Sequence, residues 1–351
     1  MSLKMPTVSI IVSAYRGIKY LPATLNSILQ QTYPYFEVLV FSNNYAQTIS
    51  WFRQHQDARF RFFFPDNLGI AQTLNQGIFQ ARGNYISWID AGDQWHPTKL
   101  QKQLFCLEQF PEIGFVSSWL MLKNGQNQST ATIVKPEYSA AMNLQIRQVN
   151  QSCSKSLMVR RCCLEEIGFF DQKLKAIPGW DLWIRLNRRY QLMQIAETLV
   201  YGVRNQGQFC KNYLILETDL QTIIDKAFPH NLGNFTLAQG RSYGSASLFL
   251  ARTVLADQES DPAIAHNYCQ QALAHDPAIG ISGDFIRLKL AIMTASCLKS
   301  DRYLHLSSLV KNIALNLRET SQRLVDWMLE EEEITVWLKN RKVESHRKER
   351  Y

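Results

Sequence analysis

Segments with strand and helix patterns alternate along the first 120 or so residues, and this alternation limits the possible fold more than any other feature. Buried strand patterns cover residues 7–12, 37–41, 85–89 and 114–118. Apolar residues at helical spacing separate them, over residues 21–29, 70–78 and 100–105. Strands joined by helical crossovers lie parallel in one sheet. The sequence therefore predicts an α/β fold with a doubly wound, mostly parallel sheet flanked by helices.

An acidic turn follows the third of these strand patterns, in the segment Trp88-Ile-Asp-Ala-Gly-Asp-Gln-Trp95. Asp90 ends the strand and Asp93 comes three residues later. Ligands of open α/β sheets bind at the carboxyl ends of the strands. Two carboxylates at such an end are costly to bury unless a cation lies between them. A hard divalent cation that also holds phosphate oxygens suits this pattern, which predicts metal-assisted chemistry on a phosphorylated donor.

The rest of the chain divides into a continuation of the sheet and a helical region. A strand at residues 156–159, a helix at 161–167 and a helix from Trp180 extend the α/β pattern, whereas residues 120–150 are polar and carry no clear pattern. From residue 213 onward the patterns are helical only, and residues 263–277 resemble part of one tetratricopeptide-type unit without a second copy. We expect an α/β domain at 1–212 and a helical domain at 213–351.

Charge and cysteine content indicate which classes of partner the chain could bind and in which cellular compartment it would occur. The net charge of +8 is compatible with nucleic acid, a membrane surface or an anionic small molecule as partner. Much of the excess lies in residues 339–350, which we interpret as a solvated tail, with an anionic lipid contact as the alternative. The seven cysteines form no metal-binding spacing, and the sequence shows no signal peptide and no apolar run of about 20 residues. We expect a cytoplasmic protein, with peripheral contact to the inner membrane face as a further option, and no nucleic-acid partner.

Six further stretches follow one another along the chain, at residues 8–15, 20–34, 67–71, 81–85, 160–171 and 181–186. In this order they resemble glycosyltransferase family 2, whose members have the GT-A fold. The resemblance implies transfer of a sugar, with inversion, from a nucleotide diphosphate donor to an acceptor hydroxyl group in polysaccharide or glycoconjugate synthesis. It also implies Mn2+ or Mg2+ as cofactor and a saccharide, lipid-linked or protein acceptor. The helices after residue 213 would supply a membrane or protein contact.

The resemblance implies specific roles for individual residues. Asp93 matches the metal ligand, and Asp90 matches an acid near the metal and the donor ribose. The donor-binding positions are Ser13, Tyr15, Ser42, Asn43 and Asn67. Asp181 is the predicted catalytic base. Six of these residues have a structural alternative: Asp93 as a helix cap, Asp90, Asn43 and Asn67 as turn residues, Tyr15 as a rim aromatic, and Asp181 as an acid in the first turn of a helix.

Three departures from the family pattern keep other functions open. Gly92 stands where a third acid is common, Ser42 and Asn43 replace an acidic pair that contacts the nucleotide base, and Pro178-Gly179 replace the usual catalytic acid. One alternative is a degenerate relative that binds a nucleotide sugar or a protein without turnover. A second is a nucleotidyltransferase, although its Gly-rich N-terminal loop with a basic residue is missing.

Overall fold

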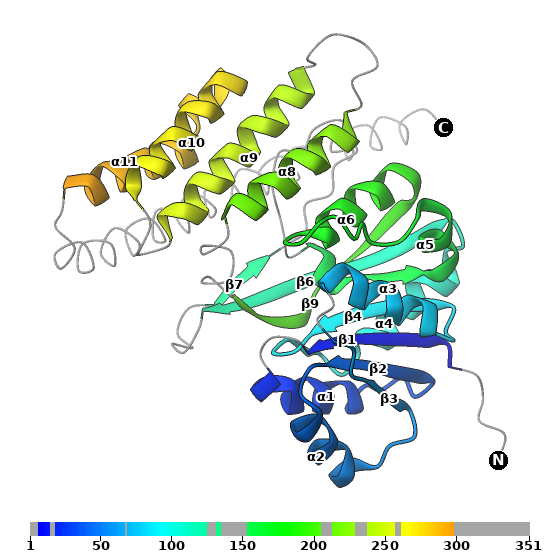
Figure 1. Cartoon of the computed structure of the whole chain (residues 1–351). Coiled ribbons are helices and arrows are strands. Elements are labelled where there is room, and N and C mark those ends of the chain that lie inside the picture. Colours follow the sequence, from blue (N-terminus) through cyan, green and yellow to red (C-terminus); the bar gives the residue numbers. More distant parts are fainter. Residues whose placement is uncertain are drawn as a thin grey trace, which may run out of the picture.

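A computed structural model describes residues 6–14, 18–66, 69–124, 131–134, 153–204, 213–228, 237–256 and 261–297. Its centre is one sheet with the strand order β3-β2-β1-β4-β8-β6-β9-β5, and β7 pairs with β6 at the side (Figure 1). Helices cover both faces of the sheet, and a group of further helices follows it in the chain. The predicted α/β class is confirmed.

The first half of the sheet is parallel. It consists of β3 (Phe60–Phe63), β2 (Phe36–Ser42), β1 (Val8–Ala14) and β4 (Tyr85–Asp90). All seven residues of β1 are buried, because β1 lies between two strands and beneath helices on both faces. The carboxyl ends of these strands meet at one edge, and the acidic turn leaves the sheet there.

The second half of the sheet is mixed. Its strands are β5 (Gln94–Trp95), β6 (Ile113–Asn124), β7 (Ala131–Val134), β8 (Met158–Arg160) and β9 (Gln191–Arg204). β8 runs antiparallel to both β4 and β6, and β6 is parallel to β9. The expectation of a mostly parallel sheet therefore holds for the first half alone. The antiparallel β8 brings the segment that precedes it to the carboxyl end of β4.

Alternation along β1 divides the interior into two apolar clusters. Val8, Ile10 and Val12 face a cluster with α1 (Leu21–Leu29) and α4 (Lys99–Gln109). Ile11 faces the other cluster, which contains α3 (Ile70–Gln80), α5 (Arg161–Ile167) and α6 (Pro178–Arg189). Successive side chains of a strand point to opposite faces, so a strand covered on both faces is apolar throughout.

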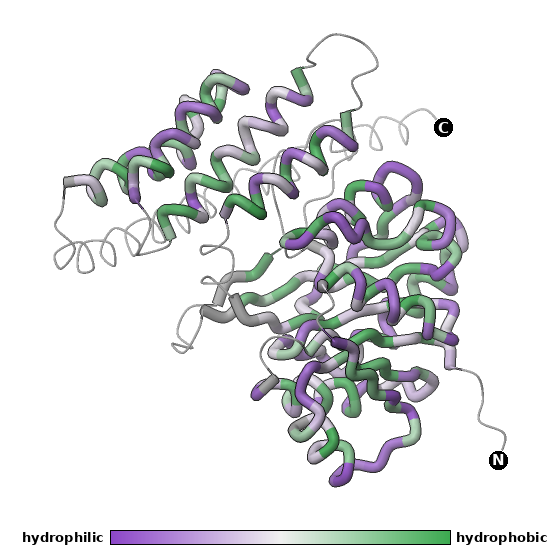
Figure 2. The backbone as a smooth tube through the Cα atoms, in the orientation of Figure 1, coloured by the Kyte–Doolittle hydropathy of each residue, from purple (hydrophilic) through white to green (hydrophobic). Residues whose placement is uncertain are grey.

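The chain after residue 212 is helical wherever the structure describes it. The helices are α8 (Tyr213–Ala227), α9 (Leu237–Leu255), α10 (Pro262–His275) and α11 (Gly283–Cys297), and they lie in succession away from α6 (Figure 1). Apolar and polar residues alternate along each of them (Figure 2). No helix among the described residues has the length and hydrophobicity needed to cross a membrane. The basic residues 339–350 lie outside the described part of the chain.

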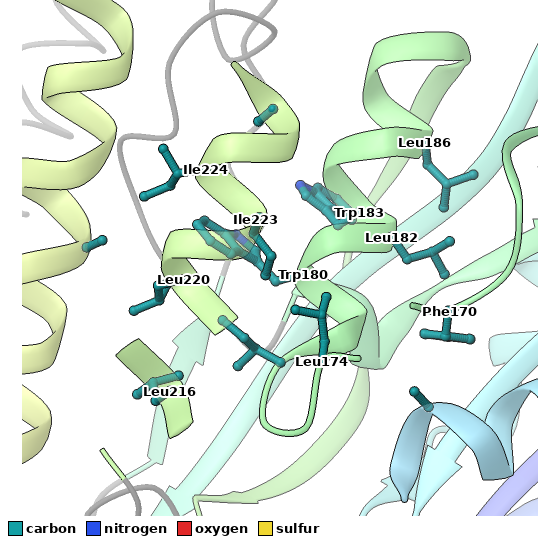
Figure 3. Close-up of a cluster of buried hydrophobic side chains, with 14 of the residues drawn as sticks. Phe170, Leu174, Trp180, Leu182, Trp183, Leu186, Leu216, Leu220, Ile223 and Ile224 are labelled. Atoms are coloured by element: carbon teal, nitrogen blue, oxygen red, sulfur yellow. The ribbon is translucent and has the colours of Figure 1, made fainter. Parts of the chain in front are cut away.

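The first of these helices, α8, packs directly on the α/β part. Figure 3 shows Trp180 and Trp183 of α6 in the same buried cluster as Leu220 and Ile223 of α8. One apolar cluster thus spans both predicted domains. The boundary after residue 212 remains a prediction.

Candidate functional site

The acidic turn lies at the carboxyl end of β4, as its sequence predicts. The backbone N–H of Asp93 donates to the carbonyl of Asp90 at 3.0 Å, which closes the turn. The Asp90 side chain is 39% exposed, whereas that of Asp93 is 4% exposed. Asp93 is therefore a buried carboxylate that requires compensation of its charge.

Helix α1 holds the turn in place. The Thr24 hydroxyl accepts from the Gly92 N–H at 2.9 Å and donates to the Asp93 carbonyl at 2.8 Å. The Ser27 hydroxyl accepts from the Trp95 N–H at 3.1 Å. Gly92 has a backbone φ of +108°, which residues other than glycine rarely adopt. The backbone conformation of this turn therefore favours glycine at position 92.

A lysine that the sequence patterns did not indicate lies between the two carboxylates. Lys155, in a 3-10 helix η3 (Cys153–Ser156), places its Nζ 2.6 Å from Asp93 Oδ2 and 3.2 Å from Asp90 Oδ2. Burial disfavours the charged amine, but the attraction of Asp93 and Asp90 outweighs this effect and raises the pKa of Lys155 above its ordinary value. The ammonium group is thus the counter-ion of the pair.

A buried polar network positions the backbone that carries Lys155. Lys99 is fully buried and donates to Gln103 at 2.7 Å and to Ser87 at 3.1 Å. Gln103 in turn donates to the carbonyl of Ser156, and Ser87 to that of Leu157, each at 2.6 Å. These two carbonyls directly follow Lys155 in the chain. Residues of α4 and β4 therefore fix η3 beside the acidic turn.

Only some of the predicted donor-binding residues lie at the carboxyl edge of the parallel strands in the structure. Ser13 lies opposite Asp90 in the pairing of β1 with β4, and its carbonyl accepts from the Ala91 N–H. Ser42 is fully buried, and its hydroxyl accepts hydrogen bonds from the Thr48 hydroxyl and the Asn44 N–H. These contacts belong to the packing of the fold. Asn43 is exposed at the end of β2. Tyr15 and Asn67 lie outside the described residues.

Asp181 of α6 is buried between two cationic side chains, one from α6 and one from α8. Arg185 Nε donates to Oδ2 at 2.8 Å, and Lys226 Nζ of α8 donates to Oδ1 at 2.7 Å. The side chain is 3% exposed. Both oxygens are already engaged, and this arrangement favours the structural alternative over the predicted role as catalytic base, which remains a prediction.

Gly179 allows α6 to approach η3. A Cβ at position 179 would come within 2.9 Å of Ser154 Cβ, closer than real Cβ atoms approach one another. Ser154 is buried, and it neighbours Lys155 in the chain. Ser154, in the 3-10 helix that presents Lys155, therefore fills the space that a side chain at position 179 would need.

The sheet, with a paired acidic turn at the carboxyl end of its fourth strand, has the GT-A-like arrangement that the sequence resemblance implies. Residues 9–168 match the family model described as "Glycosyl transferase family 2". This part of the chain is therefore similar to glycosyltransferase family 2.

Named relatives agree with this assignment. An uncharacterized glycosyltransferase of Rickettsia typhi is 26% identical over 52% of this chain and 59% of its own length. One of Rickettsia felis is 23% identical over 80% of this chain and 48% of its own. A Bacillus subtilis protein named "Putative teichuronic acid biosynthesis glycosyltransferase TuaG" is 30% identical over 34% of this chain and 50% of its own. The chain thus spans about half the length of these relatives.

Two solved structures align over most of the chain. A mannosyltransferase of Pyrobaculum calidifontis in complex with GDP-Man and Mn2+ covers 88% of this chain and 85% of its own, with 18% identity and a TM-score of 0.49. Residues 1–349 of S. aureus TarS in complex with UDP-GlcNAc cover 82% of this chain and 92% of their own, with 14% identity and a TM-score of 0.49.

Proposed function

We propose that this chain is an inverting glycosyltransferase that moves a sugar from a nucleotide diphosphate donor to an acceptor hydroxyl group. The observation that carries the proposal is the convergence of Asp90 and Asp93 on one cationic group at the carboxyl edge of the parallel strands. The family match supports the reaction class. The similarity to a protein named for teichuronic acid biosynthesis supports a role in polysaccharide or glycoconjugate synthesis, with a saccharide, lipid-linked or protein acceptor.

The carboxylate pair fits Mn2+ or Mg2+ as cofactor. Mg2+ is commonly held by one or two carboxylates together with substrate phosphates and water. Asp90 and Asp93 supply such a pair, and within the described ranges no cluster of three or more His, Cys, Asp or Glu offers a fuller ligand set. When bound, the cation would neutralise charge that develops on the departing nucleoside diphosphate.

The chain's own residues then orient the donor and complete the reaction. Ser13 and Asn43, at the ends of β1 and β2, lie along the edge where the nucleotide would bind. The proton of the acceptor hydroxyl group must pass to a base. Asp181 is the predicted base, but its two ion pairs favour the second candidate function, a relative that binds a nucleotide sugar without turnover.

Donor turnover separates the two functions. The full chain is incubated with a panel of nucleotide diphosphate sugars and Mn2+, and release of the nucleoside diphosphate is measured together with thermal stabilisation. We expect release, with Asp93→Asn lowering it at least about 100-fold. Asp57→Asn is the matched control, because Asp57 pairs with Arg59 away from the acidic turn. Stabilisation by nucleotides without any release would establish the binding function instead, and full activity of Asp93→Asn would contradict the site.

A further inference from the structure

We propose that Lys155 and a divalent cation compete for the Asp90–Asp93 pair, so that Lys155 is the internal counter-ion of the site until a cation displaces it. The inference rests on the proposed use of this pair as a cation site. It assigns to Lys155 control over when the site accepts metal. The family pattern and the acidic motif do not imply such a role.

Lys155 and a divalent cation cannot bind the Asp90–Asp93 pair at the same time. Lys155 Nζ contacts Oδ2 of both carboxylates, at 2.6 and 3.2 Å. Hard divalent cations bind carboxylate oxygens at about 2.0 to 2.6 Å, so a cation shared by the same two oxygens would occupy nearly the same point as the ammonium group. Two positive charges so close repel each other strongly in a partly buried site. The lysine must withdraw before the cation can bind both carboxylates.

Burial explains why a resident counter-ion is needed. The Asp93 side chain is 4% exposed, and its Oδ1 lies against β9, where a Cβ at Gly202 would come within 3.2 Å of it. A carboxylate enclosed in this way is costly without a partner. Lys155 supplies that partner before any ligand arrives, and the site keeps its shape in the ligand-free protein.

The structure also allows the lysine to leave. Its backbone is anchored through the carbonyls of Ser156 and Leu157, whereas the Lys155 side chain is 23% exposed. A lysine has four flexible carbons and a compact charge, so Nζ can move without movement of η3. A nucleoside diphosphate bound beside the turn would offer the displaced ammonium group new anionic partners. Metal alone should therefore bind weakly, and metal with nucleoside diphosphate more tightly.

Mn2+ binding in the absence of nucleotide tests the competition. The full chain is titrated with Mn2+ and free Mn2+ is followed by electron paramagnetic resonance. We expect Lys155→Met to lower the Mn2+ dissociation constant at least tenfold, and Asp93→Asn in that background to remove the tight site. Lys102→Met is the matched control, because Lys102 pairs with the exposed Glu197, and it should bind Mn2+ as the unmodified chain does. Equal or weaker binding by Lys155→Met, or no binding by either protein, would overturn the proposal.

A second measurement uses the unmodified chain and does not depend on the folding of a variant. Lysine acetylation is quantified by mass spectrometry at increasing Mn2+, with Lys226 as internal reference, because it pairs with Asp171 and Asp181 elsewhere. We expect Lys155 labelling to rise severalfold as Mn2+ saturates the site. Constant labelling while Mn2+ binds would refute displacement. Neither readout involves the sugar donor, so a negative result leaves the glycosyl transfer assay to decide the proposed function separately.

Discussion

Asp181 is buried between Arg185 and Lys226, and these contacts determine what its replacement should do. Asparagine keeps the shape of the side chain but removes the charge that both cations face. We expect Asp181→Asn to lower the free energy of unfolding by about 2 kcal/mol, since hydrogen bonds to charged groups contribute about 1.5 to 3 kcal/mol. Urea unfolding measures this loss. An unchanged unfolding midpoint with a loss of about 100-fold or more in turnover would instead establish Asp181 as the base.

Gly179 offers a second test at single-residue resolution. Restoration of the family acid by Gly179→Asp should destabilise the chain by about 1 to 3 kcal/mol and leave turnover no higher, because the new Cβ meets Ser154. Ser154→Gly in the same chain removes the obstructing side chain and should recover part of the stability. A double-mutant cycle in urea measures this coupling. Higher turnover in Gly179→Asp alone would contradict the packing argument.

The sequence predicts the two carboxylates of the site but not the lysine between them, and the reason is physical. Asp90 and Asp93 are local features, because a strand that ends in two acids can be recognised within six residues. Lys155 is 62 residues from Asp93 in the chain and follows a polar stretch without periodicity. Its position depends on the antiparallel pairing of β8 with β4, and strand direction in a sheet is not encoded in the local pattern.

At the scale of elements, α4 supports the site through the buried amine of Lys99. Burial holds the pKa of Lys99 well below its ordinary value of 10.5. Between the folded pKa and 10.5 the unfolded chain binds more protons, so the free energy of unfolding should rise with pH in this window and fall as the pH is lowered. The slope from one group is at most about 1.4 kcal/mol per pH unit.

Lys99→Met should remove this contribution to the pH dependence of stability. Urea unfolding between pH 7 and 10 measures the slope for the unmodified chain, for Lys99→Met and for Lys102→Met. Lys102 lies on the same helix with a partly exposed side chain, and its replacement should keep the slope. Equal slopes in all three proteins would contradict the lowered pKa of Lys99.

Element prediction succeeded where periodicity is strong and failed where it is not. The expected helix at 161–167 coincides with α5, and the strands at 37–41 and 85–89 lie within β2 and β4. The strand at 7–12 overlaps β1, which begins one residue later and ends at Ala14. The sequence patterns missed α2 (Tyr45–His55), β3 and β9. Of these, β9 carries polar residues such as Gln194 and Glu197 among its apolar ones, because it is half-buried between β6 and the short β5.

At the scale of the whole molecule, the change from α/β to helical sequence near residue 213 does not coincide with a break in packing. Phe170 and Leu174 precede α6 and lie in the cluster that α8 completes (Figure 3). Composition and periodicity report the type of element and not its partners, so the sequence predicts the transition but not the shared core. We expect the α/β part and α8 to unfold together.

Asp219 on α8 provides a test of this shared stability. Its buried carboxylate accepts backbone N–H groups of Lys175, Ala176 and Ile177, which lead into α6. Asp219→Ala would leave these donors without their acceptor, and we expect the free energy of unfolding to fall by about 2 to 4 kcal/mol in one cooperative transition. Asp261→Ala is the matched control, because Asp261 caps α10 at an exposed position and its loss should cost about 1 kcal/mol or less. In a Trp327→Phe, Trp337→Phe background all tryptophans lie before residue 213. Fluorescence then follows the α/β part, and circular dichroism follows the helices of the whole chain during urea unfolding. Two separate transitions, or equal losses in both variants, would mean that α8 is not an integral part of the α/β fold.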